Sequence, residues 1–131
     1  MGFISVKKEI MYIELKTGFQ DNGPAWIGKV KYSRTGQTIY FNNKAFRNFN
    51  VCRGNYIDIE TGDEYWISGV KKNGQDRHWA GCGKIMIDYK VVNEYLKLTE
   101  QTSLDKSKFV LVSSTNEYPI ERTKEFENRK R

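Results

Sequence analysis

The sequence has few residues of the kinds that bind metals and no segment that would cross a membrane. It contains two cysteines, Cys52 and Cys82, and one histidine, His78. A structural zinc site normally takes four Cys or His ligands, so these three residues are too few to form one. No apolar run approaches the roughly 18 residues needed to span a bilayer, and the N-terminal residues lack the pattern of a secretory signal. We therefore expect a cytoplasmic protein with free thiols and with no metal, cofactor or membrane anchor.

The composition is that of one soluble globular domain. The 131 residues are too few for two independent hydrophobic cores, and the apolar and charged shares, 38% and 29%, do not fit a disordered or fibrous chain. Aromatic residues make up 14% of the chain and are spread along it. Because aromatic side chains pack well on pleated surfaces, this content favours β-structure.

Two hairpins are predicted in the first part of the chain. Residues 11–16 predict a strand, in which apolar and polar residues alternate from Ile13 onward. Residues 26–41 then predict a hairpin in which Gly36 takes the positive-φ position of the turn. Residues 56–68 repeat this pattern with Gly62 in the turn. Such a succession of short strands is typical of a small barrel or sandwich.

The second part of the chain begins with a predicted loop over residues 71–83, followed by a strand over 84–88. Asp88 can cap a short helix, because the apolar residues after it recur on one helical face. These are Val91, Val92, Tyr95 and Leu96. The fold class that we predict is therefore mainly β: a small, antiparallel, open barrel, SH3-like or OB-like, over residues 1–98 with one short helix. Residues 99–131 are a polar extension in which 109–112 can add a strand, and its charged end is expected to be a frayed helix or disordered.

The positive charges are concentrated in one segment. The net charge is +6, and no acid occurs between Asn22 and Ile57. Aromatic residues alternate with the cations of this segment, a combination that can neutralise phosphates and stack bases. Together with the loop that starts at residue 71, the segment predicts a nucleic-acid site for RNA or single-stranded DNA. Its phosphate contacts would be Lys29, Lys31, Arg34, Lys71, Lys72 and Arg77, and Trp26, Tyr32, Tyr40 and Phe41 are candidates for its stacking platform.

Two other interpretations of the same residues stay open. In a half-exposed antiparallel sheet, lysines lie on the solvent face and aromatic residues in the core without any ligand. Acids return at Asp58, Glu60, Asp63 and Glu64, so the charge asymmetry also fits contacts within the molecule or a protein-interaction module.

The loop over residues 71–81 has the most unusual chemistry, because it carries the only histidine. His78 and Trp79 can stack a ligand whose phosphates the loop cations hold. A catalytic alternative is a metal-independent ribonuclease with His78 as general acid or base and Asp76 as its orienting partner. Nothing in the spacing supplies the second proton-transfer group, so the sequence favours a non-catalytic binding module over an enzyme.

Several short motifs resemble those of a family of small bacterial proteins of uncharacterised activity. They are Trp26-Ile27-Gly28, Ser33-x-Thr35-Gly36-x-Thr38, Gly54-Asn55-Tyr56, Glu60-Thr61-Gly62-x-Glu64-Tyr65-Trp66-x-Ser68-Gly69 and Lys71-Lys72-Asn73-Gly74-x-Asp76-Arg77-His78-Trp79. The resemblance covers roughly residues 12–96, and the segment after Leu98 departs from it. Some members carry the name deoxyxylulose-phosphate synthase. A chain of 131 residues without a GDG diphosphate-binding motif cannot support that activity.

Overall fold

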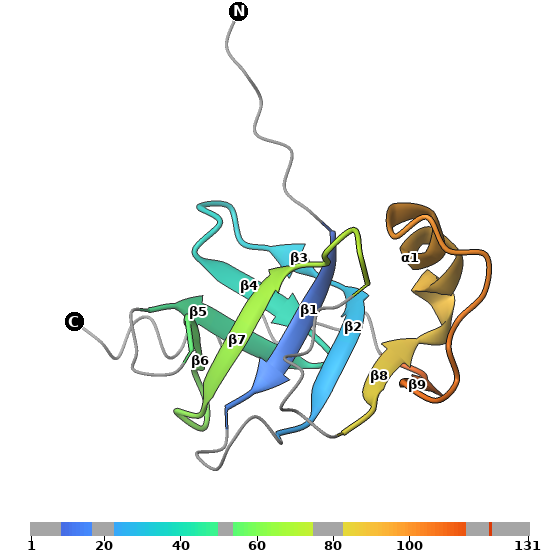
Figure 1. The fold of residues 1–131 in the computed structure, drawn as a ribbon. Coiled ribbons are helices and arrows are strands. Elements are labelled where there is room, and N and C mark those ends of the chain that lie inside the picture. Colours follow the sequence, from blue (N-terminus) through green and yellow to red (C-terminus); the bar gives the residue numbers. More distant parts are fainter. Residues whose placement is uncertain (1–8, 17–22, 50–53, 75–82, 115–120, 122–131) are drawn as a thin grey trace, which may run out of the picture.

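The fold is one curled β-sheet with a short helical segment beside it (Figure 1). The computed structural model describes residues 9–16, 23–49, 54–74, 83–114 and 121. Across the sheet the strand order is β3-β4-β5-β6-β7-β1-β2-β8-β9. The strands are β1 (Ile10–Leu15), β2 (Ala25–Lys29), β3 (Lys31–Tyr32), β4 (Thr38–Phe41), β5 (Lys44–Asn48), β6 (Tyr56–Asp58), β7 (Glu64–Gly69), β8 (Ile85–Asp88) and β9 (Phe109–Val112). The helical segment consists of a 3-10 turn, η1 (Tyr89–Val91), and a helix, α1 (Val92–Leu98).

The predicted fold class is confirmed, because the protein is mainly β and its sheet forms a small open barrel with one short helix. The strand expected over residues 26–32 is divided at Val30, whose N–H donates to the Glu9 carbonyl oxygen (2.8 Å). The first half of this segment, β2, pairs with β1, and the second half, β3, pairs with β4. One bent segment therefore contacts two strands that are far apart in the sheet order, and this curls the sheet.

Strand β1 contributes to a hydrophobic core on each of its faces. Ile10 and Tyr12 point into one core, and Met11 and Ile13, which alternate with them, point into the other. The first, which we call the helix-side core, also contains Ala25, Ile27, Ile85, Ile87, Val91, Tyr95 and Phe109. The second, the half-barrel core, also contains Val30, Ile39, Phe41, Phe46, Tyr65 and Ile67. Strand β1 is thus covered by a core on each face and paired with β7 and β2 along its two edges.

The helical segment is capped by Asp88, as predicted. The Asp88 carboxylate accepts a hydrogen bond from the Lys90 N–H (3.0 Å) and so caps the first turn. Val91 and Tyr95 then face the helix-side core, as their spacing indicated. Among the described residues, no helix has both the length and the apolar character needed to span a membrane.

The strand predicted over residues 109–112 is present as β9, and it joins the same sheet. It pairs in parallel with β8, and β8 pairs in parallel with β2, whereas the other pairings are antiparallel. A parallel pair needs a long crossover, and the helical segment lies between β8 and β9 in the chain. The sequence led us to expect a mainly antiparallel barrel, and it did not indicate these two parallel pairs, because it does not show which distant strands become neighbours.

The turn residues explain which hairpins were predicted and which was missed. Gly36 and Gly62 both have φ of 78°, as expected for the turns that they occupy. Strand β5 was not predicted. It returns from β4 through Asn42 and Asn43, whose φ values of 51° and 64° are those of a type I′ hairpin turn. Asn tolerates this conformation better than other non-glycine residues, so the Asn-Asn pair was the available signal.

Gly28 is required by close packing rather than by an unusual backbone conformation. A Cβ built on Gly28 would overlap the ring of Phe41. That ring is buried in the half-barrel core, so it has little room to move away. The glycine of the Trp26-Ile27-Gly28 motif is therefore explained by the approach of β2 to β4.

We expect Gly28→Ala to lower the free energy of unfolding by about 1–3 kcal/mol, the usual cost of overpacking a core. Urea denaturation followed by tryptophan fluorescence measures the change. The double variant Gly28→Ala/Phe41→Leu should lose less stability than the sum of the losses of the two single variants, because the smaller side chain leaves room for the new methyl group. Strict additivity of the two losses would contradict this explanation.

Candidate functional site

Five of the predicted phosphate-binding cations are described, and the pairings of β1 bring them to one end of the sheet. Lys29 pairs with Ile10 at the start of β1, and Gly69, the last residue of β7, pairs with Met11. In Figure 1 the start of β1, the ends of β2 and β7, and β3 all lie at the upper end of the sheet. We call this region the basic end. Its cations are Lys29, Lys31, Arg34, Lys71 and Lys72, and all five are exposed.

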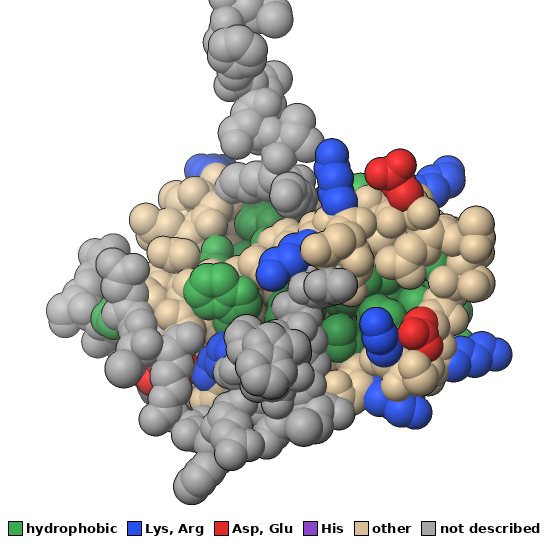
Figure 2. Space-filling model, in the orientation of Figure 1, with side chains coloured by type: hydrophobic (Ala, Val, Ile, Leu, Met, Phe, Trp, Pro, Cys, Tyr) green, Lys and Arg blue, Asp and Glu red, His purple; other side chains and the backbone are tan. Residues whose placement is uncertain are grey.

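The orientation of these lysines is set by the elements that carry them. Lys29 and Lys31 point away from the half-barrel core, because Val30 between them is part of it. The Lys29 Nζ lies 3.8 Å from a Glu9 carboxylate oxygen, and both side chains are exposed, so this pair contributes little. Figure 2 shows Lys and Arg side chains along the upper rim of the molecule and a second group around β8 and β9.

Lys71 and Lys72 lie on a formed turn. The Gly74 N–H donates to the Lys71 carbonyl oxygen (3.0 Å), and Gly74 has φ of 72°. A Cβ on Gly74 would overlap the side-chain amide of Gln101, which follows α1. The Lys-Lys-Asn-Gly motif therefore places its two lysines on a turn that packs beside the end of the helix.

The aromatic residues proposed as a stacking platform belong to the interior. Tyr40 and Phe41 are buried, so their rings are not available to stack on a base. Trp26 and Tyr32 are half-buried and pack against the half-barrel core. Burial raises the pKa of the Tyr32 hydroxyl above its usual value, with smaller contributions from Tyr56 and Glu9. Lys29 and Lys31 face away from the half-barrel core, which Tyr32 and Phe41 face, whereas Tyr40 lies opposite Lys31 on the same face of the sheet and is nevertheless buried.

The remaining predicted site residues, Arg77, His78 and Trp79, lie outside the described residues. So do Cys52 and Cys82. Within the described ranges, no group of three or more His, Cys, Asp or Glu side chains is placed to hold a metal ion. The catalytic alternative centred on His78 stays a prediction.

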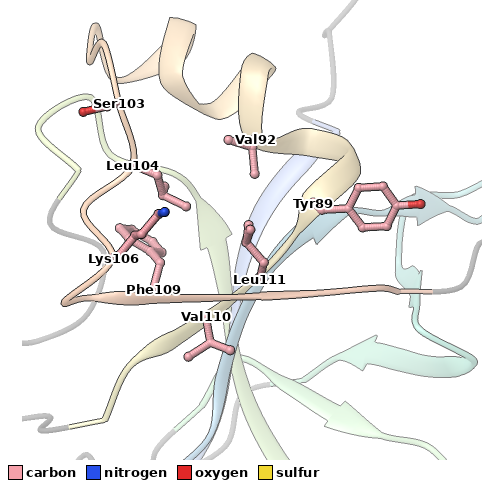
Figure 3. A pocket seen from close by; sticks show the side chains of 8 residues that line it. All are labelled: Tyr89, Val92, Ser103, Leu104, Lys106, Phe109, Val110 and Leu111. Carbon is pink, nitrogen blue, oxygen red and sulfur yellow. The ribbon is translucent and has the colours of Figure 1, made fainter.

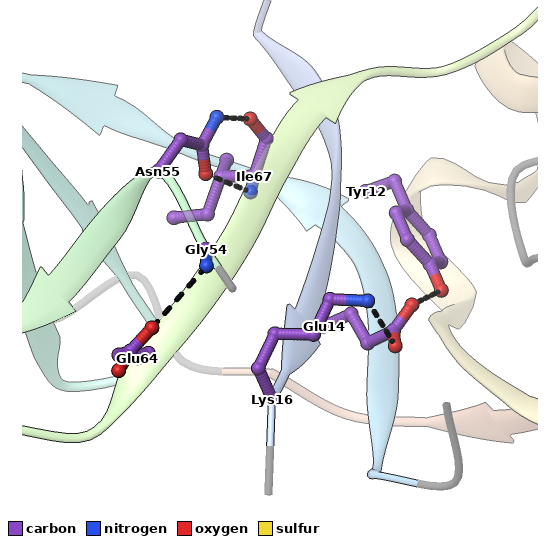
Figure 4. A network of polar contacts seen from close by, with 7 residues as sticks. All are labelled: Tyr12, Glu14, Lys16, Gly54, Asn55, Glu64 and Ile67. Atoms are coloured by element: carbon purple, nitrogen blue, oxygen red, sulfur yellow. Dashed lines mark hydrogen bonds and ion pairs between the residues drawn. The ribbon is translucent and has the colours of Figure 1, made fainter. Parts of the chain in front are cut away.

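The Gly54-Asn55-Tyr56 motif has a structural role (Figure 4). The Asn55 side-chain amide donates to the Ile67 carbonyl oxygen and accepts from the Ile67 N–H, both at 2.8 Å. A Cβ on Gly54 would overlap the backbone carbonyl of Tyr65. The motif that contains Gly54 therefore packs directly against the motif that contains Tyr65. At this point Asn55 makes the hydrogen bonds to β7 that a neighbouring strand would otherwise make.

A second polar network lies on β1 and continues just past its end (Figure 4). Glu14 is buried, and its carboxylate accepts hydrogen bonds from the Tyr12 hydroxyl and from the Lys16 ammonium group, the latter at 2.9 Å. These three residues alternate along β1, so their side chains share one face. A buried carboxylate that is paired and hydrogen-bonded in this way needs no ligand to be stable.

The acidic hairpin contacts the basic segment within the molecule. Asp58 is buried, and its carboxylate accepts from the Glu60 N–H (2.9 Å) in the turn before β7. The Lys44 Nζ lies 3.8 Å from the other Asp58 oxygen. One part of the charge asymmetry is thus satisfied within the molecule.

An apolar groove that was not predicted from the sequence lies beside β9 (Figure 3). It has a volume of about 680 Å³ and lies between β9, the start of the helical segment and the loop before β9. Its lining residues are Tyr89, Val92, Ser103, Leu104, Lys106, Phe109, Val110 and Leu111. The uncharged run over 109–112 was the available signal, but the sequence does not show that this strand lies at an edge.

Asn55→Ala should lower the free energy of unfolding by about 1–3 kcal/mol, because the Ile67 N–H and carbonyl groups both lose their partner. Amide hydrogen exchange at Ile67 should also become faster. Asn93→Ala, the same change at an exposed position on α1, is the matched control and should alter stability far less. Equal effects of the two substitutions would refute the role assigned to Asn55.

Tyr65 gives a pH test of the half-barrel core. Burial, followed by the charges of Asp58 and Asp63, raises the pKa of its hydroxyl from 10.0 to about 12. The unfolded chain ionises first, so the stabilisation is fully present below pH 10 and is lost as the pH rises towards 12, by about 1.4 kcal/mol per pH unit. Urea denaturation across this interval should show a smaller loss for Tyr65→Phe than for the wild type. An identical loss in both proteins would contradict the assignment.

Comparison of the chain with protein-family models, with curated proteins and with solved structures gives no match. The motif resemblance described above therefore stays a prediction. The function is therefore inferred from the arrangement of the described residues.

Proposed function

We propose that this protein is a binding module that holds the phosphate backbone of nucleic acid at its basic end. The observation that carries this proposal is the register of β1. Lys29 lies beside the first residue of β1, and the turn with Lys71 and Lys72 follows the β7 residue that pairs with Met11. Two cation clusters that are distant in the sequence thus share one end of the sheet, and cations that neutralise phosphates gain affinity by releasing counterions.

The charge balance around these cations favours an anionic ligand. The segment that carries Lys29, Lys31 and Arg34 contains no acid from Asn22 to Ile57. Glu9 is the acid that pairs with Lys29, and this ion pair is exposed. The phosphate backbone is a suitable ligand because exposed lysines on several separate elements can each meet one phosphate along an extended strand.

The buried rings change the kind of binding that we propose. Without Tyr40 and Phe41 at the surface, the site offers charge but little stacking. Trp66 is 41% exposed, but it pairs with Glu14 near the end of β1, away from the basic end. The proposed ligand is therefore single-stranded DNA or RNA of any sequence, bound through its phosphates and not through its bases.

We expect the affinity of a fluorescein-labelled, mixed-sequence single-stranded oligonucleotide to fall steeply with salt, as measured by fluorescence anisotropy. The double variant Lys71→Gln/Lys72→Gln should weaken binding at least about tenfold at low salt. It should also lower the slope of log affinity against log salt by about 1.4, since each lost phosphate contact on a single strand is worth ~0.7.

The matched control is Lys106→Gln/Lys108→Gln, which removes the same charge from exposed lysines near β9. It should change the affinity about twofold or less, because the field of distant charges is screened at moderate salt. An affinity that does not respond to salt would overturn the proposal. Equal losses in the two double variants would show that only net charge matters and would reject a site at the basic end.

A further inference from the structure

The two end strands of the sheet differ in how they are protected against pairing with another chain. Strand β3 has only two residues, Lys31 and Tyr32, and its lysine is exposed. Strand β9 has the sequence Phe-Val-Leu-Val, with no charge, proline or glycine. Short length and edge lysines are common ways to block unwanted strand pairing, and β9 is twice as long as β3 and has no lysine within it.

The backbone of β9 has hydrogen-bonding groups on its outer side. The Ile85 N–H donates to the Lys108 carbonyl oxygen (2.9 Å), and β8 and β9 then continue in parallel register. In such a ladder alternate residues turn their backbone groups to the neighbour, so those of Phe109 and Leu111 point away from β8. Among the described residues, no strand pairs with β9 on that side.

The side chains along this edge form an apolar surface. Val110 and Leu111 are 43% and 56% exposed, and they lie on opposite faces of β9 (Figure 3). Phe109 is buried at the base of the groove, and Leu104 and Val92 line its wall. An added strand would place alternate side chains into the groove and over Val110, so the backbone edge and the apolar pocket would be used by the same ligand.

The charges at the start of β9 indicate which kind of strand fits. Lys84, Lys106 and Lys108 are exposed where β8 and β9 begin, against one exposed acid among residues 101–108, Asp105, and Lys106 lines the groove. At the other end, Lys90 already donates to the Ser114 carbonyl oxygen (2.6 Å). A ligand with acidic residues at one end and alternating apolar residues after them would match this surface.

A second copy of this chain fits the edge less well. Two β9 strands paired around a two-fold axis would be antiparallel, so Lys106 and Lys108 of one copy would lie near residues 112–114 of the other. Residues 109–114 contain no acid. The cations would then lack partners, so charge complementarity favours a different protein.

We propose that the outer edge of β9 and the groove beside it bind an extended, acidic-apolar segment of a partner protein as an additional strand of the sheet. This surface is separate from the basic end, and the inference does not depend on nucleic-acid binding. The partner supplies backbone hydrogen bonds to Phe109 and Leu111, an apolar side chain for the groove and carboxylates for the lysines at the start of β9.

The test uses the full chain and the capped peptide Glu-Glu-Val-Thr-Val-Thr-Val as probe, titrated in ¹⁵N–¹H NMR. We expect a dissociation constant of about 1 mM or tighter, with shifts concentrated at the amides of Leu104, Lys106, Phe109 and Leu111. The same peptide with both threonines N-methylated keeps its side chains but loses the N–H groups that face β9 in a parallel pair, and it should bind at least about tenfold more weakly. Replacing both glutamates by lysines should weaken binding at low salt.

Leu111→Lys should abolish the chemical-shift changes. Leu98→Lys is the matched control and should leave them in place. Both leucines are exposed, at 56% and 48%, and Leu98 is not among the residues that line the groove. Equal binding of the methylated and unmethylated peptides would overturn strand addition. An absence of shifts at β9 would overturn the site, and a dimer that Leu111→Lys disrupts would show that the occupant is a second copy.

Discussion

The burial of β1 on both faces is the constraint on which the rest of the structure depends. Alternate residues of this one strand enter two different cores, so both the curled sheet and the helical segment are fixed to it. Its partners on either side, β7 and β2, are thereby held in a defined register. A shift of one residue would exchange the two sets of side chains between cores of different shape, and such a shift is strongly disfavoured.

The short sequence motifs are explained largely by contacts between strands. Gly28 allows the ring of Phe41 to approach β2, and Asn55 completes the hydrogen bonding of Ile67. Gly36, Gly62 and Gly74 occupy left-handed turn positions. Motifs of this kind are needed to form the barrel, because tight turns and close backbone approaches tolerate few residue types. They are therefore weak evidence about a ligand.

The two surfaces with functional interest lie on different parts of the same sheet. The basic end gathers lysines from β2, β3 and the turn after β7, and it depends on the register of β1. The edge of β9 depends instead on the parallel crossover through the helical segment. Charge dominates at the first surface, and at the second an apolar groove adjoins the backbone groups of β9 that no other described strand pairs with. A module with both could hold a nucleic acid and a protein at the same time without competition between them.

The amino-acid sequence by itself determined the local features: the positive-φ turns, the Asp88 cap, the alternation of Lys29, Val30 and Lys31, and the all-β class. These depend on interactions between residues close in the chain, which composition and period reveal. The tertiary structure alone decided that β9 joins β8 at an edge, that Tyr40 and Phe41 are interior, and that Lys71 lies at the same end as Lys29. The reason is physical, because packing against distant segments decides which strands become neighbours and which face of each strand is buried. The identity of a single aromatic or basic residue does not show which side of the sheet it will face.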